Sequence, residues 1–253
     1  MKKSALCLSI LLLLSFQLSL TAFATDNTAP IGGLTPEEEK QTNEEIIQEV
    51  LNDPTISDEA KASVIEKITF VAKEKSQACR APVYERVVTY YPKMQEDSTK
   101  CAPATIQQSL EVYNGYGCPL ESQTTIQNKI GKAPGLSAVL DYLNKHQKKT
   151  VLVRKKVNSM EDIRGCIDWS YHHSCPIIFT FAADTTFWYY NTQGHFTNIA
   201  GYSYSNYLII DPFYFVKYVP SSKGSEGRYW ISGDKAWRAN TMLFGVGNNT
   251  IGW

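Results

Sequence analysis

The sequence predicts an α+β protein in which helical segments come first and β-strands follow. Two charge-rich amphipathic helices are expected early in the chain, whereas the part beyond about residue 80 is aromatic and rich in β-forming residues. Hydrophobic residues make up 43% and charged residues 20% of the 253 residues, which is typical of a folded globular protein. The 25 basic residues balance the 25 acidic ones, and this argues against nucleic-acid binding, which needs a basic excess.

Residues 1–24 have the pattern of a secretory signal peptide. Lys2 and Lys3 form a short basic region, an apolar stretch over 10–20 follows, and Ala22 and Ala24 are the small residues that a signal peptidase reads. An N-terminal membrane anchor is the alternative, which the polar residues within the apolar stretch disfavour. We therefore expect a secreted monomer, extracellular or in the cell envelope, that is not held at the membrane after cleavage.

Residues 25–78 are expected to form a helical extension. Thr35 and Glu38 make a capping box around a proline at the first helical position, which predicts a helix that ends at Asp53. A second helix is expected from Ser57 onward, because its apolar residues recur at helical spacing.

Residues 79–253 are expected to form the main domain. Helices are predicted over 102–113, 136–146 and 159–169. Strands are predicted over 83–91, 150–157, 176–181, 195–202, 207–211, 215–219, 228–231 and 242–246. The strands over 195–202 and 207–211 are expected to pair as a hairpin across Ser205-Asn206.

Cys101 stands at the expected N-terminus of the helix over 102–113. The helix dipole and the unpaired backbone N–H groups there favour the thiolate and lower the pKa of the thiol. Ser98 and Thr99 are expected to supply capping hydroxyls, and Lys100 would add positive charge. Because the thiolate is the reactive form, Cys101 is a candidate nucleophile.

A thiolate nucleophile needs a partner that exchanges protons near neutral pH, and histidine is the usual one. His195 opens one strand of the predicted hairpin, and Asp211 closes the other, so both are expected at the same end. A carboxylate at that position can orient the imidazole. Gln95, six residues before Cys101, can donate its side-chain amide to a developing oxyanion, with the Cys101 N–H as the second donor.

The series Gln95-x5-Cys101-Ala102-Pro103-Ala104 resembles the motif of papain-like cysteine peptidases that process bacteriocin leaders, the double-glycine peptidases, and of their free-standing secreted relatives. Residues 194–202 resemble the histidine block of that family, and residues 208–212 resemble its acid block. The resemblance covers roughly residues 90–245. The chain departs from the family at Ala102, where glycine is usual; the added methyl group either narrows the approach of the substrate or is tolerated.

The resemblance implies a papain-like fold and hydrolysis of a protein or peptide substrate through an acyl-enzyme, without a metal or organic cofactor. It also implies a role for each residue: Cys101 would be the nucleophile, His195 the base, Asp211 the orienting acid and Gln95 the oxyanion donor.

Five cysteines remain once the one within residues 1–24 is set aside, and an odd number in an oxidising compartment leaves one thiol over. We expect disulfides between Cys166 and Cys175 and between Cys79 and Cys118, which leave Cys101 as the thiol, although four cysteines allow three connectivities. The cysteines and histidines over 166–175 fit no standard structural-zinc spacing.

Several alternatives stay open at this point. The same site could carry out transglutaminase- or amidase-type acyl transfer, or the chain could be a non-catalytic binding module on a peptidase-like scaffold. The aromatic residues 187–190 either line the substrate cleft or pack in the core. Residues 25–78 are either a pro-segment that blocks the cleft until it is removed or a permanent subdomain.

Overall fold

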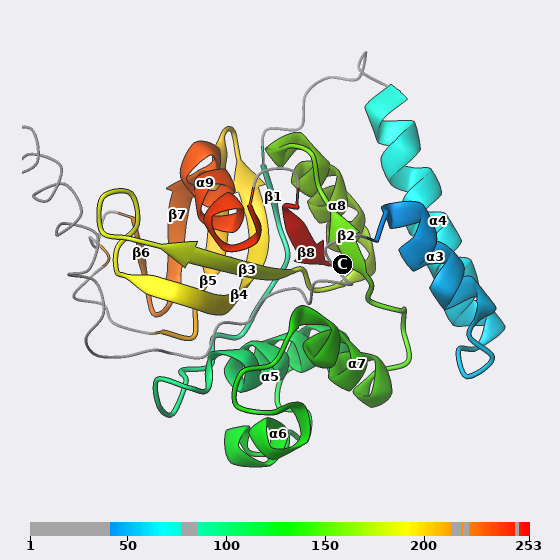
Figure 1. The fold of residues 1–253 in the computed structure, drawn as a ribbon, viewed down its shortest axis with the longest axis horizontal. Helices are drawn as coiled ribbons and strands as arrows, with labels where there is room; N and C mark the ends of the chain where they lie inside the picture. Colours follow the sequence, from blue (N-terminus) through cyan, green and yellow to red (C-terminus); the bar gives the residue numbers. More distant parts are fainter. Residues whose placement is uncertain (1–40, 77–84, 214–218, 220–222, 246–247) are drawn as a thin grey trace, which may run out of the picture.

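The computed structural model describes residues 41–76, 85–213, 219, 223–245 and 248–253. In chain order its helices are α3 (Asn43–Asn52), α4 (Asp58–Ser76), α5 (Cys101–Asn114), α6 (Gln123–Ile130), α7 (Leu136–His146), α8 (Met160–His173) and α9 (Gly233–Phe244). Its strands are β1 (Glu85–Val87), β2 (Arg154–Lys156), β3 (Ile178–Ala183), β4 (Thr192–Ser203), β5 (Asn206–Ile210), β6 (Gly224–Ser225), β7 (Arg228–Ser232) and β8 (Thr250–Gly252). The predicted α+β class is confirmed, since most helices precede an antiparallel sheet (Figure 1). None of the helices in these ranges combines the length and the apolar character needed to cross a membrane.

The sheet is built around β4. In the described part of the chain, seven of its eight strands follow the order β2-β8-β3-β4-β5-β7-β6, and the eighth, β1, pairs with the C-terminal end of β4. Gly201 makes this last pairing possible, because a Cβ at that position would lie only 2.2 Å from the Arg86 carbonyl oxygen. Strand β4 is therefore held along both of its edges, which makes it a rigid support for a functional site.

Helices cover the central strands. Helices α5 and α8 pack against β4, and α9 packs against β3. All of β3 and almost all of β4 are consequently buried. This explains why the sequence of β3 is a continuous apolar run, without the alternation of a half-exposed strand.

Helices α3 and α4 pack beside α8 and β2, on the right of the view in Figure 1. Ile46 of α3 and Val64 of α4 form a small hydrophobic cluster with Val151 and Val153, which precede β2. Further along α4, Val71 belongs to the main hydrophobic core. These two helices therefore share buried surface with the rest of the protein.

Helix α3 begins later than the sequence analysis predicts. Residues 41–42 are not helical, and Thr42 is the N-cap of a capping box that Glu45 completes. The box predicted from Thr35 lies outside the described residues, and a single helix running from it to Asp53 is wrong. Thr42 and Glu45 have the same spacing as Thr35 and Glu38, but they lie closer in sequence to the apolar residues of the helix. They hydrogen-bond the backbone N–H groups at the N-terminus of α3.

The strand predicted over 242–246 is wrong, because Met242 lies near the end of helix α9. The buried residues of α9 recur at helical spacing, at Gly233, Ala236, Ala239, Asn240 and Phe244. A short apolar run cannot by itself distinguish a strand from the end of a helix. Helix α6 and strand β8 were not predicted, and the strand predicted over 215–219 lies mostly outside the described residues.

The predicted disulfide between Cys166 and Cys175 is not formed. Both residues are buried thiols in the main core, and the sulfur of Cys175 lies 3.2 Å from the Tyr113 hydroxyl, which hydrogen-bonds with it. Cys118 also carries a thiol, whereas its predicted partner Cys79 lies outside the described residues. Cys175 packs against helix α5, and its sulfur contacts Tyr113 there. The spacing of the cysteines in the sequence does not reveal this contact.

Candidate active site

Cys101 is the first residue of α5 and lies half-buried at the N-terminus of the helix. The backbone N–H groups of Ala102 and Phe196 hydrogen-bond to its sulfur. The expected hydroxyl cap is not used: the N-cap is Lys100, without a side-chain cap bond, and Thr99 gives its hydroxyl to a neighbouring side chain. The helix therefore keeps N–H groups available for a negatively charged sulfur.

Polar contacts fasten α5 to β4 just behind the sulfur. Thr105, one turn after Cys101, donates its hydroxyl to the Phe196 carbonyl at 2.9 Å. One turn further, Ser109 donates to the side-chain oxygen of Asn198 at 3.0 Å. Because all four of these partners are buried, the bonds are shielded from water and fix the position of the helix relative to the strand.

His195 lies in β4, where it pairs with Phe181 of β3. Its Nε2 is 2.8 Å from an oxygen of Asp211, the residue that follows β5. That contact leaves Nδ1 as the ring nitrogen for the hydrogen bond between His195 and Cys101. The imidazole is 5% exposed and three aromatic rings surround it, with centroids 5.5 to 6.1 Å away: Phe181, Tyr190 and Phe213.

The electrostatics favour an ion pair between the sulfur and the imidazole. Burial alone would raise the pKa of the Cys101 thiol, but the hydrogen bond and charge of His195, helped by the two backbone N–H groups, lower it from its ordinary value of 9.0. Burial alone would lower the pKa of His195, but the charge and hydrogen bond of Asp211, and then Cys101, raise it from 6.5 to about 10. Between the two pKa values the sulfur is a thiolate and the ring an imidazolium.

Asp211 is fully buried and accepts four hydrogen bonds. Its Oδ1 receives the His195 ring nitrogen and, at 2.8 Å, the Phe213 backbone N–H. Its Oδ2 receives two tyrosine hydroxyls, from Tyr190 at 2.5 Å and from Tyr229 at 2.6 Å. These four donors replace the hydration that the buried carboxylate has lost, and they hold it in one orientation.

The two tyrosines were not singled out as site residues by the sequence analysis. Tyr190 belongs to the segment 187–190, three of whose side chains pack in the core, with Tyr189 half-buried against it, which is the core-packing alternative given above. Tyr229 lies in β7, which pairs with the strand before Asp211. The alternation of residues in β7 could have indicated that the Tyr229 side chain is buried, but the direction of its hydroxyl depends on how the strands pack.

Gln95 precedes α5 in a loop that contacts the residues after Asp211. Its backbone N–H donates to the Pro212 carbonyl at 2.9 Å, and its side chain is 9% exposed. The side-chain Nε2 donates to the Asp97 carbonyl at 2.7 Å, which uses one of its two hydrogens. The buried Oε1 has no hydrogen-bond partner within the described residues. An amide with unused donor and acceptor capacity can take part in binding a substrate.

Lys100 differs from the sequence expectation, whereas for Ala102 the structure favours one of the two alternatives given there, that the methyl group is tolerated. The Lys100 ammonium pairs with the carboxylates of Glu96 at 2.7 Å and Asp97 at 3.2 Å, so its charge is neutralised locally. Ala102 is 1% exposed and packs in the main core. Its methyl group therefore does not stand where a substrate would approach from solvent.

The described residues contain no group of three or more His, Cys, Asp or Glu side chains placed to hold a metal ion. His173 contacts the Trp169 carbonyl and Glu66, and Cys175 contacts Tyr113, so these side chains have protein partners.

Comparison with known proteins gave matches among solved structures. A scan against family models and a search of curated proteins found no match. A Bacillus anthracis protein described as a C39-like peptidase is 13% identical over 66% of this chain and 96% of its own, with a TM-score of 0.44. The double glycine motif protease of an AMS/PCAT transporter, solved with its leader peptide, is 14% identical over 66% and 91%, with a TM-score of 0.39. The peptidase domain of Streptococcus ComA, a bifunctional ABC transporter involved in quorum sensing, is 14% identical over 65% and 97%, with a TM-score of 0.41.

Proposed function

We propose that this protein is a cysteine peptidase that hydrolyses peptide bonds through a triad of Cys101, His195 and Asp211. The observation that supports this most strongly is the continuous hydrogen-bonded series from the sulfur to the imidazole and on to a buried carboxylate. The opposed pKa shifts of Cys101 and His195 add to this support, because they lower the pKa of the thiol and raise that of the imidazole, which favours the thiolate–imidazolium pair. A nucleophile, a base and an orienting group in this order are the requirements for acyl transfer.

In the first half of the reaction, the Cys101 thiolate attacks the carbonyl carbon of the scissile peptide bond. The carbonyl oxygen becomes an oxyanion, which accepts hydrogen bonds from the second Nε2 hydrogen of Gln95 and from the Cys101 backbone N–H. The imidazolium of His195 gives its proton to the leaving amine as the C–N bond breaks. An acyl-enzyme and a neutral imidazole remain, with Asp211 still orienting the ring.

In the second half, a water molecule replaces the amine. Neutral His195 takes a proton from the water as its oxygen attacks the thioester carbon. The same donors hold the second oxyanion, and the carbon–sulfur bond breaks to release the product as a carboxylic acid, which loses its remaining proton to the solvent. The proton on His195 and the charge on sulfur then restore the starting ion pair.

We propose a protein or peptide substrate outside the cytoplasm. The substrate class is suggested by the triad, and the location by the signal-peptide pattern of residues 1–24. With an extracellular location, the enzyme would act as a secreted monomer on extracellular or envelope polypeptides.

Cleavage of a diverse fluorogenic peptide library by the mature chain tests this proposal. We expect cleavage by the wild type, none by Cys101→Ala, and a loss of about 100-fold or more in kcat for His195→Ala, because the proton donor to the leaving amine is removed. Cys118→Ala is a matched control, since it also removes a half-buried thiol, and it should retain activity.

Mass spectrometry of the products separates this function from its rivals. New isopeptide bonds, or deamidated glutamine without cleaved peptides, would show transglutaminase or amidase chemistry at the same site. Slow labelling of Cys101 by iodoacetamide, together with no cleavage, would contradict catalysis and favour a binding module.

A further inference from the structure

The loop that carries Gln95 is held from two sides. On one side, the Gln95 backbone N–H donates to the Pro212 carbonyl at 2.9 Å. On the other side, the side-chain amide of Gln123 bonds the two neighbouring peptide groups: its Nε2 donates to the Met94 carbonyl at 2.8 Å, and its Oε1 accepts the Glu96 N–H at 2.9 Å. The Gln123 amide thus makes the pair of hydrogen bonds to the peptide groups on both sides of Gln95 that a neighbouring β-strand would otherwise make.

Both hydrogens of the Gln123 side-chain amide are used in hydrogen bonds. Its second Nε2 hydrogen goes to the Oε1 of Gln107 on α5 at 3.2 Å, and the Nε2 of Gln107 in turn donates to the Glu121 carbonyl at 2.7 Å. Gln123 is 4% exposed. Buried and bonded at both ends of its amide, this side chain has a single orientation available.

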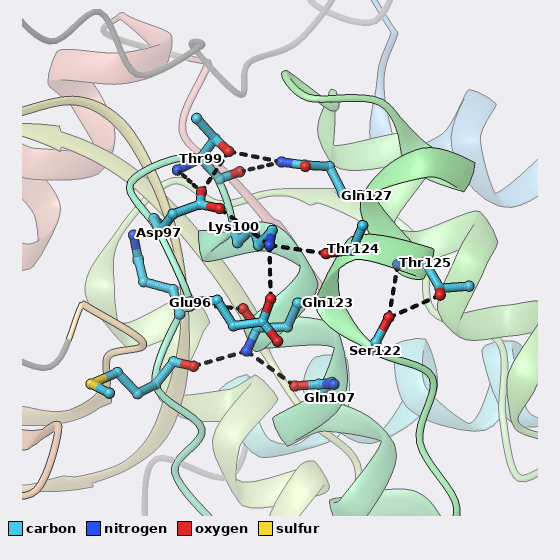
Figure 2. A network of polar contacts seen from close by, with 12 residues as sticks. Glu96, Asp97, Thr99, Lys100, Gln107, Ser122, Gln123, Thr124, Thr125 and Gln127 are labelled. Carbon is cyan, nitrogen blue, oxygen red and sulfur yellow. Dashed lines mark hydrogen bonds and ion pairs between the residues drawn. The ribbon is translucent and has the colours of Figure 1, made fainter.

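Helix α6 contacts the same loop a second time, at Thr99 and Lys100, as Figure 2 shows. Gln127, one turn after Gln123, donates its Nε2 to the carbonyl and the hydroxyl of Thr99 at 3.0 and 2.9 Å. Thr124 accepts the Lys100 ammonium at 3.0 Å. Side chains of α6 therefore hold the segment from Met94 to Lys100 by hydrogen bonds at both of its ends, although α6 contributes no side chain to the triad.

We propose that Gln123 is a positioning residue for the oxyanion donor, acting through the backbone on both sides of Gln95. This inference rests on the proposed function, in which Gln95 contacts the reacting carbonyl oxygen. An oxyanion donor must lie at hydrogen-bond distance from the oxygen in the transition state, and a displacement of about 1 Å is enough to lose much of its effect. Gln123 fixes the backbone position from which the Gln95 side chain extends, whereas the hydrogen bond to the Asp97 carbonyl fixes the direction of the Gln95 amide.

The test compares Gln123→Met with the wild type, because methionine preserves the length and most of the volume of the side chain but makes none of the hydrogen bonds. Gln147→Met is the matched control: Gln147 is also buried and also bonds nearby backbone groups, but it serves the turn at 149–150. Acylation is followed as the burst of p-nitrophenolate from p-nitrophenyl acetate, which needs no knowledge of the natural substrate. Iodoacetamide alkylation of Cys101 in the same samples reports the thiolate alone.

We expect Gln123→Met to slow the acylation burst about tenfold, with the alkylation rate unchanged within about twofold. Gln147→Met should change neither rate. In a Gln95→Ala background, Gln123→Met should cause no further loss of acylation, because the group that it positions is already absent. Gln123→Glu, which keeps an acceptor for the Glu96 N–H but sets a carboxylate against the Met94 carbonyl, should show the same loss and serves if the methionine variant does not fold.

Three results would overturn the inference: unchanged acylation in both Gln123 variants, an undiminished loss in the Gln95→Ala background, or a parallel loss of alkylation. The last would mean that Gln123 acts on Cys101 and not on Gln95. A different result bears on the proposed function itself: if Gln95→Ala alone acylates at the wild-type rate, Gln95 is not the oxyanion donor.

Discussion

At the level of single residues, the buried carboxylate of Asp211 sets the chemistry of the site. Taking a charged carboxylate out of water is costly unless donors replace its hydration. Asp211 has four donors, two of them the hydroxyls of Tyr190 and Tyr229 on the same oxygen. The charge and hydrogen bond of Asp211 raise the pKa of His195, and the charge and hydrogen bond of His195 in turn lower the pKa of Cys101. We therefore expect the reactivity of the sulfur to depend on two tyrosines that bond Asp211 and not the sulfur itself.

Removing either hydroxyl should make the thiolate harder to form. Tyr190→Phe and Tyr229→Phe each remove one hydrogen bond that holds Asp211 in place against His195. The effect of Asp211 on the imidazole then weakens, so the pKa of His195 falls and the pKa of Cys101 rises back toward 9.0. The acid limb of the pH profile for iodoacetamide alkylation should move up by about one pH unit for each variant, given hydrogen bonds to a charge of about 1.5–3 kcal/mol. Tyr189→Phe is the control, because its hydroxyl contacts the Trp230 carbonyl and not Asp211. An acid limb that stays in place in both variants would contradict the series from tyrosine to sulfur.

At the level of elements, helices α3 and α4 behave as part of the folded protein. Ile46, Val64 and Val71 are each less than 10% exposed, and they cover Val151, Val153 and part of α8. A segment that only blocks an active site until it is removed would be expected to contact that site. Among the described residues, the main contacts of α3 and α4 are with each other, α8 and β2, whereas the proposed triad lies on α5, β4 and the end of β5. This arrangement favours the permanent subdomain over the pro-segment.

A chain that lacks residues 25–78 should therefore be destabilised and not activated. Three buried aliphatic side chains at about 1.5–3 kcal/mol each amount to much of the 5–15 kcal/mol by which a typical domain is stable. We expect the loss of a cooperative thermal transition by circular dichroism, together with loss of rapid Cys101 alkylation. Removal of residues 25–40 alone leaves α3 and α4 in place and should preserve both. A shortened chain that melts like the wild type and cleaves faster would instead support an inhibitory pro-segment.

At the level of the whole molecule, Lys67 joins the N-terminal helices to the rest of the protein. It lies on α4, is fully buried, and donates to the Val151 carbonyl at 2.7 Å. Its ammonium lies over the rings of Trp169 in α8 and Trp253 at the end of the chain, 5.0 and 5.2 Å from their centroids. Burial lowers the pKa of Lys67 from its ordinary 10.5, although Cys175 and Cys166 act in the opposite direction. A single side chain thus links α4, α8 and the C-terminus at the cost of a desolvated charge.

Lys67→Met tests whether the buried charge of Lys67 makes the stability of the protein depend on pH in the expected direction. A lysine whose pKa is lower in the folded state binds fewer protons there than in the unfolded chain, so the penalty is full at low pH and disappears as pH rises toward 10.5. The free energy of unfolding of the wild type, minus that of Lys67→Met, should therefore increase as pH rises below 10.5, by at most about 1.4 kcal/mol per pH unit. Groups common to both proteins, including Cys101 and His195, cancel in this difference. Lys61→Met on the same helix is the control, and an equal slope in the two variants would contradict the prediction.

Elements with strong local signals agree closely with the structure. Helix α7 has the predicted bounds, and α5 differs by one residue at each end. Helix α8 begins one residue after its predicted start at 159, with Ser159 as the N-cap, but it continues to His173, four residues beyond the predicted end. These features depend on apolar periodicity and on capping between residues close in the chain, which an isolated sequence displays. The start of α3 and the whole of α9 were misassigned, because two capping boxes compete in the first case and a short apolar run is ambiguous in the second.

The residue types and their order along the chain were enough to nominate Cys101, His195, Asp211 and Gln95, since each carries chemistry that few side chains offer. Packing alone decided which groups surround them. Tyr190 and Tyr229 reach Asp211 from other strands, Gln123 reaches the Gln95 loop from α6, and Cys175 turns toward Tyr113. The physical reason is that a hydrogen bond between distant residues depends on ångström-scale placement of whole elements, and local propensity contains no information on that placement.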